Sequence, residues 1–452
     1  MTTAVAQGSA LLHFSRNGAY GPDGTGLLVL ERGEGAYVFD TDGKRYVDAL
    51  SSLYCSQIGY SFGEEMAAAA ASQLQELAFN TMWGTAHPPA LELADRLAGL
   101  APQPINRVFF TSGGSESVES AIKLARQYHA WGGQPERRKA IARKTAYHGV
   151  TLGALALTGV PAYKDAFGPP AFPVRHVSNT NPFRSDVQGA ALTARLLGEL
   201  EDTILEEGPD TISLISAEPV QNAGGCFVPP PGYWEGLRKI ADRYGILLHA
   251  DEVITGFGRI GEWFAVERYG GLPDLITVAK GLTSAYAPMG AVLVSDKVAE
   301  PFYEGKHTLL HGITFGGHPL CAAIALKNLE IFEREGVLEN VNAREAGLQA
   351  RLEQLRDEFT VVGDVRGAGF FWALEFVKDD ANTRLDADER ERLLRGYMPQ
   401  AMLDAGLIAR ADDRGDAVMQ IAPPLISDDE VLDEIVDKMR TVLRGAQAVI
   451  LG

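Results

Sequence analysis

Short apolar runs alternate with amphipathic segments through the middle of the chain. Several of the runs are continuous stretches of Val, Ile and Leu, which is typical of strands that are covered on both faces. Because a helix-like segment separates successive runs, the pattern predicts an α/β fold with a mostly parallel central sheet of seven strands. The predicted strands are 107–110, 140–144, 174–177, 212–217, 246–250, 275–278 and 291–294. Between them, the segments 115–130 and 233–244 carry apolar residues at helical spacing.

The two ends of the chain differ from this middle part. Residues 35–50 have the pattern of a hairpin that turns at Asp42-Gly43. From about residue 326 the sequence predicts charged helices, one strand in GAGFFWALEF (367–376) and a closing helix over 428–443. We therefore expect residues 1–60 and 326–452 to form one smaller α+β domain, packed on a large α/β domain of residues 61–325.

Composition excludes several classes of protein. The formal net charge of −18 argues against nucleic acid or an anionic membrane surface as a partner. The three cysteines have no C-x-x-C spacing, so neither a disulfide framework nor a zinc site is expected. The N-terminus lacks the pattern of a secretory signal, and the uncharged stretch 307–326 predicts a loop followed by a helix, not a membrane span. A cytoplasmic location is the default expectation.

A glycine-rich turn follows the first predicted strand of the large domain. Ser112, Gly113, Gly114 and Ser115 stand between that strand and a predicted helix. Glycines let the backbone approach a ligand, and the free N–H groups of a helix N-terminus attract phosphate. A plain strand-to-helix turn with Ser115 as N-cap explains the same residues equally well. The motif has no Gly-Lys-Ser/Thr and is not a Walker A loop.

Asp251 and Lys280 end the two predicted strands that follow each other at 246–250 and 275–278. A carboxylate at this edge can hold a pyridinium nitrogen protonated, and a desolvated lysine favours the neutral amine that forms a Schiff base. Alone, Asp251 is also explained as a turn cap and Lys280 as a solvent-facing lysine. Ligands bind at the carboxyl ends of strands in such sheets, and together the three features indicate one cofactor, pyridoxal 5′-phosphate.

Two further patterns are weaker. Residues 256–261 satisfy G-x-G-x-x-G, but they lie away from the strand and no long helix is predicted after them, which disfavours a dinucleotide site. His307 and His311 have the i, i+4 spacing of metal ligands, but no third ligand has a fitting spacing. No metal site is expected.

The sequence resembles the class III aminotransferases, which are fold type I pyridoxal phosphate enzymes, from about Gly33 to the C-terminus. The resemblance is carried by several motifs in the family's order: FFTSGGSESVESAIKLARQYH, AYHG, AEPVQ, HADEVITGFGR, DLITVAKGLT and GITFGGHP. It implies that Lys280 forms the Schiff base, that Asp251 pairs with the pyridine nitrogen and that Gly114 and Ser115 bind the phosphate. The other implied cofactor contacts are Tyr147 on the ring, His148 supporting Asp251, Glu218 at the ring hydroxyl, Val253 under the ring and Thr314 on the phosphate of the neighbouring subunit.

Within that family the chain is most similar to ω-amine:pyruvate transaminases. Where ornithine, acetylornithine and GABA aminotransferases usually carry a glutamate that gates an arginine, this chain has Ala223. LSSLYCSQIGY, AFNTMWGTAHP and LIARADDRGDAVMQIAPPL carry the resemblance. It implies an apolar pocket walled by Tyr54, Met82 and Trp83, and a mobile Arg410 that grips the carboxylate of a keto acid. Because residues 411–414 separate Arg410 from Gly-Asp more widely than usual, Arg414 is an alternative clamp or a surface charge; motif position favours Arg410.

The implied activity is transamination from an amine or ω-amino acid to pyruvate by a ping-pong mechanism, which gives an aldehyde or ketone and alanine. The implied assembly is a homodimer with shared active sites, or a tetramer. The alternatives are other class III reactions, such as taurine or diamine transamination, dialkylglycine decarboxylation and glutamate-1-semialdehyde aminomutation. A non-catalytic binding protein of the same fold is disfavoured because both Lys280 and Asp251 are present. The sequence does not identify the donor.

Overall fold

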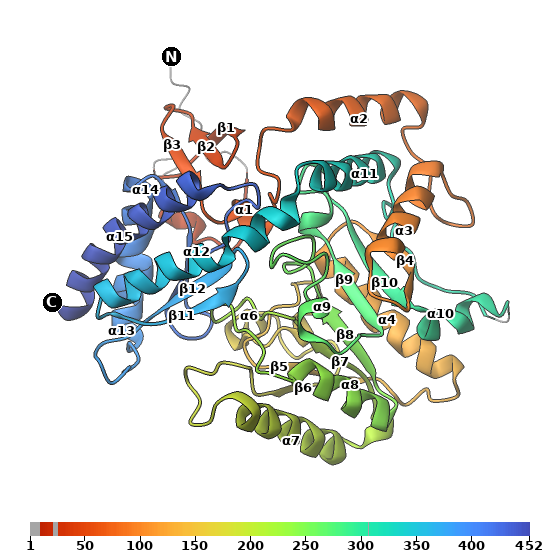
Figure 1. Ribbon diagram of the computed structural model, residues 1–452. Helices are drawn as coiled ribbons and strands as arrows, with labels where there is room; N and C mark the ends of the chain where they lie inside the picture. The colour runs from red at the N-terminus through yellow and green to blue at the C-terminus, as the bar shows by residue number, and fades with distance from the viewer. Residues whose placement is uncertain (1–9, 21–25, 306) are drawn as a thin grey trace.

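The computed structural model describes residues 10–20, 26–305 and 307–452, and its centre is a seven-stranded sheet (Figure 1). The strand order is β4-β10-β9-β8-β7-β5-β6. β10 is antiparallel to both of its neighbours, and the other strand pairs are parallel. The mostly parallel seven-stranded sheet predicted from the sequence is confirmed. Its strands are β4 (Ile105–Thr111), β5 (Lys139–Arg143), β6 (Val174–Val177), β7 (Ile212–Ala217), β8 (Leu247–Asp251), β9 (Leu275–Val278) and β10 (Gly290–Ser295).

Helices cover both faces of this sheet, which is why its strands are apolar at successive positions. On β7, Leu214 belongs to a buried cluster with residues of α4 (Gly114–Trp131), whereas Ile215 belongs to a cluster with residues of α7 (Gly189–Glu207) and α8 (Tyr233–Tyr244). Neighbouring residues of a strand point to opposite faces, so each face has its own core. The two predicted helices match α4 and α8.

Two four-stranded sheets contain strands from the ends of the chain. β1 (Leu30–Glu34), β2 (Tyr37–Asp40) and β3 (Arg45–Asp48) pair in sequence, and β13 (Leu407–Ile408) joins β3 in parallel. The predicted hairpin is confirmed, with Gly43 at a φ of +82° in its turn. The second sheet has the order β11-β12-β15-β14, formed by β11 (Val362–Ala368), β12 (Phe371–Phe376), β15 (Val418–Ile421) and β14 (Arg410–Asp412).

One predicted strand is wrong. GAGFFWALEF does not form a single strand, because the chain reverses at Gly369, which has a φ of +55°, and divides the segment between β11 and β12. The closing helix is longer than expected and continues to Leu451. The division into domains at residues 60 and 325 stays a prediction. The sequence predicts no secretory signal at the N-terminus, and residues 1–9 of that segment lie outside the described part of the chain.

The other helices are mostly amphipathic and pack around these sheets. Residues 307–318 form a loop, and α11 begins at Pro319, a favoured first residue of a helix. The His318 side chain caps this helix by accepting a hydrogen bond from Leu320 N. No helix in the described ranges has the length and apolar character that a membrane span needs. These helices are α1 (Ser51–Tyr54), α2 (Gly63–Glu76), α3 (Pro88–Leu100), α5 (Leu152–Leu157), α6 (Pro161–Asp165), α9 (Val266–Tyr269), α10 (Asp296–Tyr303), α11 (Pro319–Arg334), α12 (Val337–Glu358), α13 (Ala387–Arg390), α14 (Met398–Asp404) and α15 (Asp429–Leu451), with η1 (Asn17–Ala19), η2 (Pro209–Thr211), η3 (Lys280–Leu282) and the π-helical η4 (Glu391–Tyr397).

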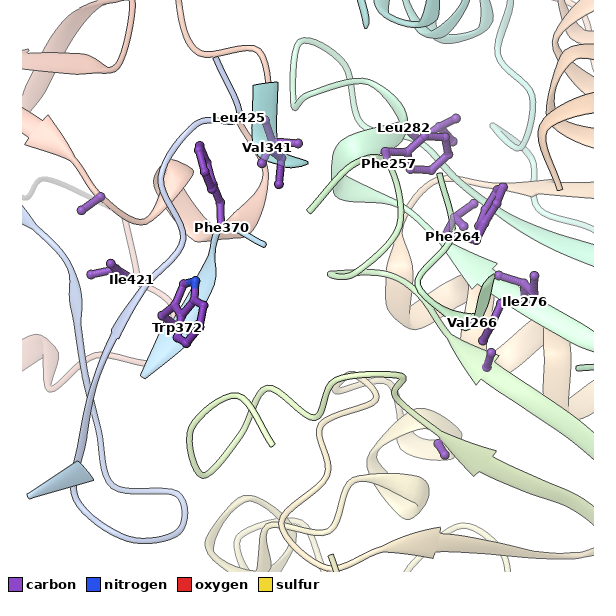
Figure 2. Close-up of a cluster of buried hydrophobic side chains, with 14 of the residues drawn as sticks. Phe257, Phe264, Val266, Ile276, Leu282, Val341, Phe370, Trp372, Ile421 and Leu425 are labelled. Carbon is purple, nitrogen blue, oxygen red and sulfur yellow. The ribbon is translucent and has the colours of Figure 1, made fainter. Parts of the chain in front are cut away.

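A single large hydrophobic cluster connects the central sheet with the C-terminal part of the chain. Figure 2 shows part of it, with Ile276 of β9 near Phe264, and Phe370 near Trp372 of β12. α12 runs from the middle of the molecule into the C-terminal part (Figure 1). This continuous core fixes the carboxyl edge of the large sheet against β14 and β15.

Candidate active site

Five strand ends meet at one edge of the large sheet, and the residues that follow them enclose a cavity of about 150 Å³. β4 and β9 are both antiparallel to β10, so β4 has its carboxyl end at the same edge as β9, β8, β7 and β5. Most of the predicted cofactor residues therefore come together here. The lining residues are Gly114, Ser115, Tyr147, His148, Gly149, Glu218, Val220, Asp251, Val253, Ile254, Thr255, Ala279 and Lys280.

Lys280 lies at the cavity in an unusual backbone conformation. It is the first residue of η3, two positions after β9 ends, and its φ is +35° in the left-handed region. A non-glycine residue held there stores backbone strain, which is common at functional sites. The turn is held from α11, where the Asn328 amide donates hydrogen bonds to the carbonyl oxygens of Gly281 (2.9 Å) and Leu282 (3.1 Å).

Asp251, the last residue of β8, is buried and receives three hydrogen bonds. His148 Nδ1 lies 2.7 Å from Oδ2, while Thr277 Oγ1 (3.1 Å) and the backbone N of Val253 (3.2 Å) donate to Oδ1. Burial by itself would raise the pKa of Asp251, but the hydrogen bond and charge of His148, with smaller effects of His249 and Val253 N, lower that pKa below its ordinary value. The site therefore keeps this carboxylate ionised.

A chain of buried polar groups supports Asp251 from inside the sheet. Thr277 donates to Asp251, so its oxygen accepts the hydrogen of His249 Nε2 at 2.9 Å. The other ring nitrogen, Nδ1, then accepts from Ser216 Oγ at 2.9 Å. Burial lowers the pKa of His249 to about 4, which keeps the ring neutral as this arrangement requires.

Thr277 and His249 were not predicted from the sequence. The signal was present: His249 lies two residues before Asp251 and therefore on the same face of β8, and Thr277 is paired with Asp251 in the register of β8 and β9.

The N-terminus of α4 forms the opposite wall of the cavity. Ser115 Oγ accepts a hydrogen bond from Val150 N at 3.1 Å. A Cβ on Gly114 would lie 2.9 Å from Val253 Cγ1, and a Cβ on Gly149 would lie 2.4 Å from Ser115 Oγ. Both glycines therefore allow Val253 and the loop of Gly149 to pack closely against the start of α4. Ser112 and Gly113 precede the helix, and the Ser112 N–H donates to Glu116 Oε2.

Tyr147 and Glu218 follow β5 and β7. Glu218 Oε1 accepts from Tyr147 N at 3.1 Å and Oε2 accepts from Asn222 N at 2.9 Å, so the carboxylate fixes two loops. Burial raises the pKa of Glu218 although His148 and Arg143 oppose the shift. The Tyr147 ring lines the cavity, and the guanidinium carbon of Arg414 lies 5.7 Å from its centroid.

Arg410, Asp412 and Arg414 form a charged cluster beside this ring. Arg414 Nε lies 2.8 and 2.9 Å from the two carboxylate oxygens of Asp412, and its Nη2 also donates to Asp412. The closest approach of Arg410 is 3.8 Å, from Nε to Asp412 Oδ2. The Arg414 side chain is only 5 % exposed, so Arg414 is not a surface charge.

The residues that resemblance assigns to the substrate pocket are not all at the cavity. Tyr54 has a φ of +62° and points into the core, where its hydroxyl donates to Gln420 Oε1 at 2.9 Å and its ring packs edge-on against Phe371. Burial raises the pKa of Tyr54 to about 12 although Arg410 and Arg414 oppose the shift. Ala223 is also buried and does not line the cavity.

Met82 and Trp83 line a different and larger cavity, of about 800 Å³, together with residues of the loop 309–316. Thr314, in this loop, is exposed. Trp83 is 64 % exposed and Phe315 60 %. In one chain these residues are therefore not brought together with Lys280, and their assignment to the site stays a prediction.

The two weaker sequence patterns have structural explanations. His311 lies 2.8 Å from both Ser120 Oγ and Lys123 Nζ, and His307 stacks on Trp131. In the described ranges no group of three or more His, Cys, Asp and Glu could hold a metal ion. Residues 256–261 lie in turns followed only by the four-residue α9, which does not fit a dinucleotide site. The three cysteines are free.

The residues around the smaller cavity fit pyridoxal phosphate. The N-terminus of α4, which has no side-chain cap, suits the phosphate, an ionised buried carboxylate suits a protonated ring nitrogen, and a lysine amine suits an aldehyde. Among the described residues that line the cavity, Lys280 alone carries a primary amine.

Comparison with known proteins agrees with this chemistry. The family model "Aminotransferase class-III" matches residues 20–443. A probable aminotransferase of Mycobacterium tuberculosis is 49% identical, with 96% of this chain and 92% of the relative covered. A putrescine–pyruvate aminotransferase of Pseudomonas aeruginosa is 39% identical, with 94% and 92% covered. The crystal structure of an (S)-enantioselective omega-transaminase from Thermomicrobium roseum has a TM-score of 0.90 at 41% identity, with 97% and 96% covered.

Proposed function

The chain belongs to the class III aminotransferases, and from that premise we propose that it transfers an amino group from an amine or ω-amino acid to pyruvate. Class III aminotransferases depend on pyridoxal phosphate. The observation that carries the proposal is the meeting of Lys280, Asp251 and the α4 N-terminus around one cavity, with the cluster of Arg410, Asp412 and Arg414 beside Tyr147 in its lining. The pyruvate-using relative from Pseudomonas aeruginosa supports the choice of acceptor.

The cofactor, when bound, supplies an aldehyde that condenses with amines and a pyridinium ring that takes up electrons. The free N–H groups at the start of α4, with Ser115, would hold its phosphate. Asp251 would keep a proton on the ring nitrogen, because three donors hold its carboxylate ionised inside the protein. Val253 and Tyr147 line the cavity and would contact the ring.

Lys280 performs the proton transfers. Its Nζ would hold the cofactor covalently through the aldehyde and would be freed when the amine donor takes its place. The free lysine amine would act first as general base, taking a proton from the donor's Cα, and then as general acid, giving that proton back. Water would release the donor as an aldehyde or ketone while its amino group stays in the site, and pyruvate would then take up that amino group to give alanine.

Arg410 binds the carboxylate of the keto acid. A guanidinium can pair with a carboxylate through two parallel hydrogen bonds, and the Arg410 guanidinium makes none with other described residues. An uncharged amine needs no such partner. The apolar part of the donor is placed by resemblance against Tyr54, Met82 and Trp83.

The active unit is a homodimer with shared sites. Thr314 lies outside the cavity and is exposed in the single chain, as expected of a residue that serves the phosphate of a neighbouring subunit. The exposed Trp83 and Phe315 beside it fit a surface that a second chain covers. A cytoplasmic location remains a prediction from the sequence.

A donor screen with pyruvate tests the proposal. β-Alanine, taurine, diamines and arylalkylamines are offered in turn, and alanine formation is measured. The visible absorbance of the holoenzyme is expected to bleach with a productive amine and to return with pyruvate. Carbon dioxide release without alanine would indicate a decarboxylase, isomerisation of an amino aldehyde an aminomutase, and no reaction with any donor would contradict the proposal.

A further inference from the structure

Strand β14 and the turn after it carry three charged side chains beside Tyr147, which lines the cavity. Arg410 and Asp412 are two residues apart on this strand and therefore lie on the same face. Arg414 follows after a turn and returns to Asp412, and its backbone N–H also donates to Asp412 Oδ1 at 3.0 Å. Asp412 is 3 % exposed and the Arg414 side chain 5 %, so this pair is buried, while 26 % of the Arg410 side chain is exposed.

The two arginines are not equivalent in this cluster. Arg414 uses Nε and Nη2 on the Asp412 carboxylate, as a bidentate ion pair does. The pKa of Asp412 is lowered, since Arg414 outweighs the effect of burial. The 3.8 Å separation of Arg410 from Asp412 is too long for a hydrogen bond, and no other described residue accepts one from Arg410.

Charge counting then limits what the cluster can bind. The two guanidinium groups and one carboxylate have a net charge of +1. Because Arg414 forms the hydrogen-bonded ion pair with Asp412, the guanidinium that can still bind a carboxylate is that of Arg410. Arg259 is occupied elsewhere, because it donates to the carbonyl oxygens of Phe370 and Pro423. If a keto acid brought a second carboxylate to the same place, that carboxylate would lose its water without gaining an ion-pair partner, which costs binding free energy.

We propose that Asp412 is a specificity-determining residue that commits Arg414 and leaves Arg410 as the single carboxylate site, so that the enzyme accepts keto acids with one carboxylate and disfavours those with two. The inference rests on the proposed function and adds the reason for the acceptor preference. It also explains the wide spacing between Arg410 and Gly415-Asp416. The inserted residues include both a carboxylate, that of Asp412, and the guanidinium of Arg414 that pairs with it.

Substitution of Asp412 by Asn tests this assignment. Asp412→Asn removes the charge at nearly constant shape, frees Arg414 and raises the cluster to +2. The ratio of kcat/KM for 2-oxoglutarate to that for pyruvate is expected to rise about 10-fold or more. Asp413→Asn is the matched control, because Asp413 pairs instead with Arg395 and the change in total charge is the same. Its ratio is expected to equal that of the wild type.

Binding of unreactive acids gives a readout that does not depend on turnover. Titration calorimetry of the holoenzymes with propanoate and glutarate is expected to show tighter glutarate binding only in Asp412→Asn. The double variant Asp412→Asn/Arg414→Gln removes both charges and returns the cluster to +1. It is expected to restore the wild-type preference.

A third variant covers the case in which Asp412→Asn does not fold. Arg414→Gln leaves Asp412 free to pair with Arg410, so the KM for pyruvate is expected to rise about 10-fold while the half-reaction of an uncharged amine is unchanged. Unchanged acceptor ratios and glutarate binding in Asp412→Asn, or an unchanged pyruvate KM in Arg414→Gln, overturn the inference. A wild-type enzyme that forms no alanine from pyruvate overturns the proposed function instead.

Discussion

Arg410 Nε lies 3.8 Å from Asp412 Oδ2 on the same face of β14, close enough for electrostatic attraction but too far for a hydrogen bond. The attraction favours a position of the guanidinium beside Asp412 when no substrate carboxylate is present. The absence of a hydrogen bond to a described residue leaves the group able to move. This geometry suits a side chain that grips a keto acid in one half-reaction and withdraws in the other.

Arg410→Ala is expected to raise the KM for pyruvate about 30-fold and to spare the half-reaction of an uncharged amine. The loss corresponds to about 2 kcal/mol, the lower end of the range for truncating one member of a charge pair, because a quarter of the side chain is exposed. Steady-state kinetics with both substrates varied measure the two constants separately.

The control for this variant is Arg395→Ala. Arg395 is half-exposed and pairs with Glu391 and Asp413, away from the cavity. Its removal is expected to change neither constant. Arg414→Ala is not a neutral control, because it leaves the buried Asp412 without its partner. Equal losses for pyruvate and the amine in Arg410→Ala would remove Arg410 from the role of carboxylate clamp.

Lys280→Ala is expected to abolish transamination while the protein stays folded. No other residue lining the described cavity has a primary amine that could hold the cofactor and carry the proton. Borohydride reduction of the wild-type holoenzyme, followed by peptide mass mapping, is expected to place the pyridoxyl group on Lys280. A label on Lys123, which lines the larger cavity, or on any other lysine would contradict the assignment.

Asp251→Asn is expected to keep cofactor bound but to slow the chemical step by roughly 10²-fold or more, since the α4 N-terminus is intact while the ring nitrogen loses its ionised partner. Single-turnover absorbance measures this step directly. Thr277→Val gives a graded comparison, because it removes one of the three donors to the carboxylate and leaves the carboxylate itself. A single-turnover rate near that of the wild type in Asp251→Asn would limit Asp251 to a structural role.

The sequence predicted the strand ends of this site well, because the physical signal is local. A parallel strand that is covered on both faces is mostly apolar, so the first charged residue marks its end, as with Asp251 and Lys280. Parallel strands then bring these ends to one edge without further information. The roles of Glu218 and Tyr147 were implied only by the resemblance of AEPVQ and AYHG to the family's motifs.

The parts that sequence reasoning did not predict depend on tertiary geometry. The positive φ at Tyr54 turns its ring into the core against Phe371, which no local pattern announces. The return of Arg414 onto Asp412 is a loop conformation, and without it Arg414 is indistinguishable from a surface charge. Met82 lines the larger cavity and lies away from Lys280 in the single chain. No pattern in the sequence indicates this separation.

The shared dimeric site is tested by mixing two inactive or impaired subunits. Thr314→Ala is expected to weaken cofactor binding, and Lys280→Ala to abolish activity. If Thr314 serves the partner's phosphate, each mixed dimer has one site with both defects and one wild-type site. The mixture is then expected to recover activity at limiting pyridoxal phosphate. Failure to recover, or an active monomer in sedimentation at micromolar concentration, would place Thr314 outside a shared site.

His249 gives a prediction of stability against pH. Burial lowers its folded-state pKa to about 4, whereas the unfolded chain has a value of about 6.5. Between these values the unfolded state takes up a proton that the folded state refuses, so this residue costs stability as the pH falls below about 6.5. His249→Asn is expected to be less stable than the wild type at pH 7, because it loses the hydrogen bonds to Ser216 and Thr277.

At acid pH, the difference in the free energy of unfolding between the wild type and His249→Asn should therefore become smaller. The variant lacks the titrating group, so its deficit in the free energy of unfolding is expected to shrink by about 2–3 kcal/mol between pH 7 and pH 4.5, as measured by urea denaturation. His13→Asn, at an exposed position, is the matched control and is expected to keep the acid sensitivity of the wild type. A difference in stability that stays constant across this range would mean that His249 takes up a proton in the folded protein as it does in the unfolded chain, and that Nδ1 then donates to Ser216 Oγ instead of accepting from it.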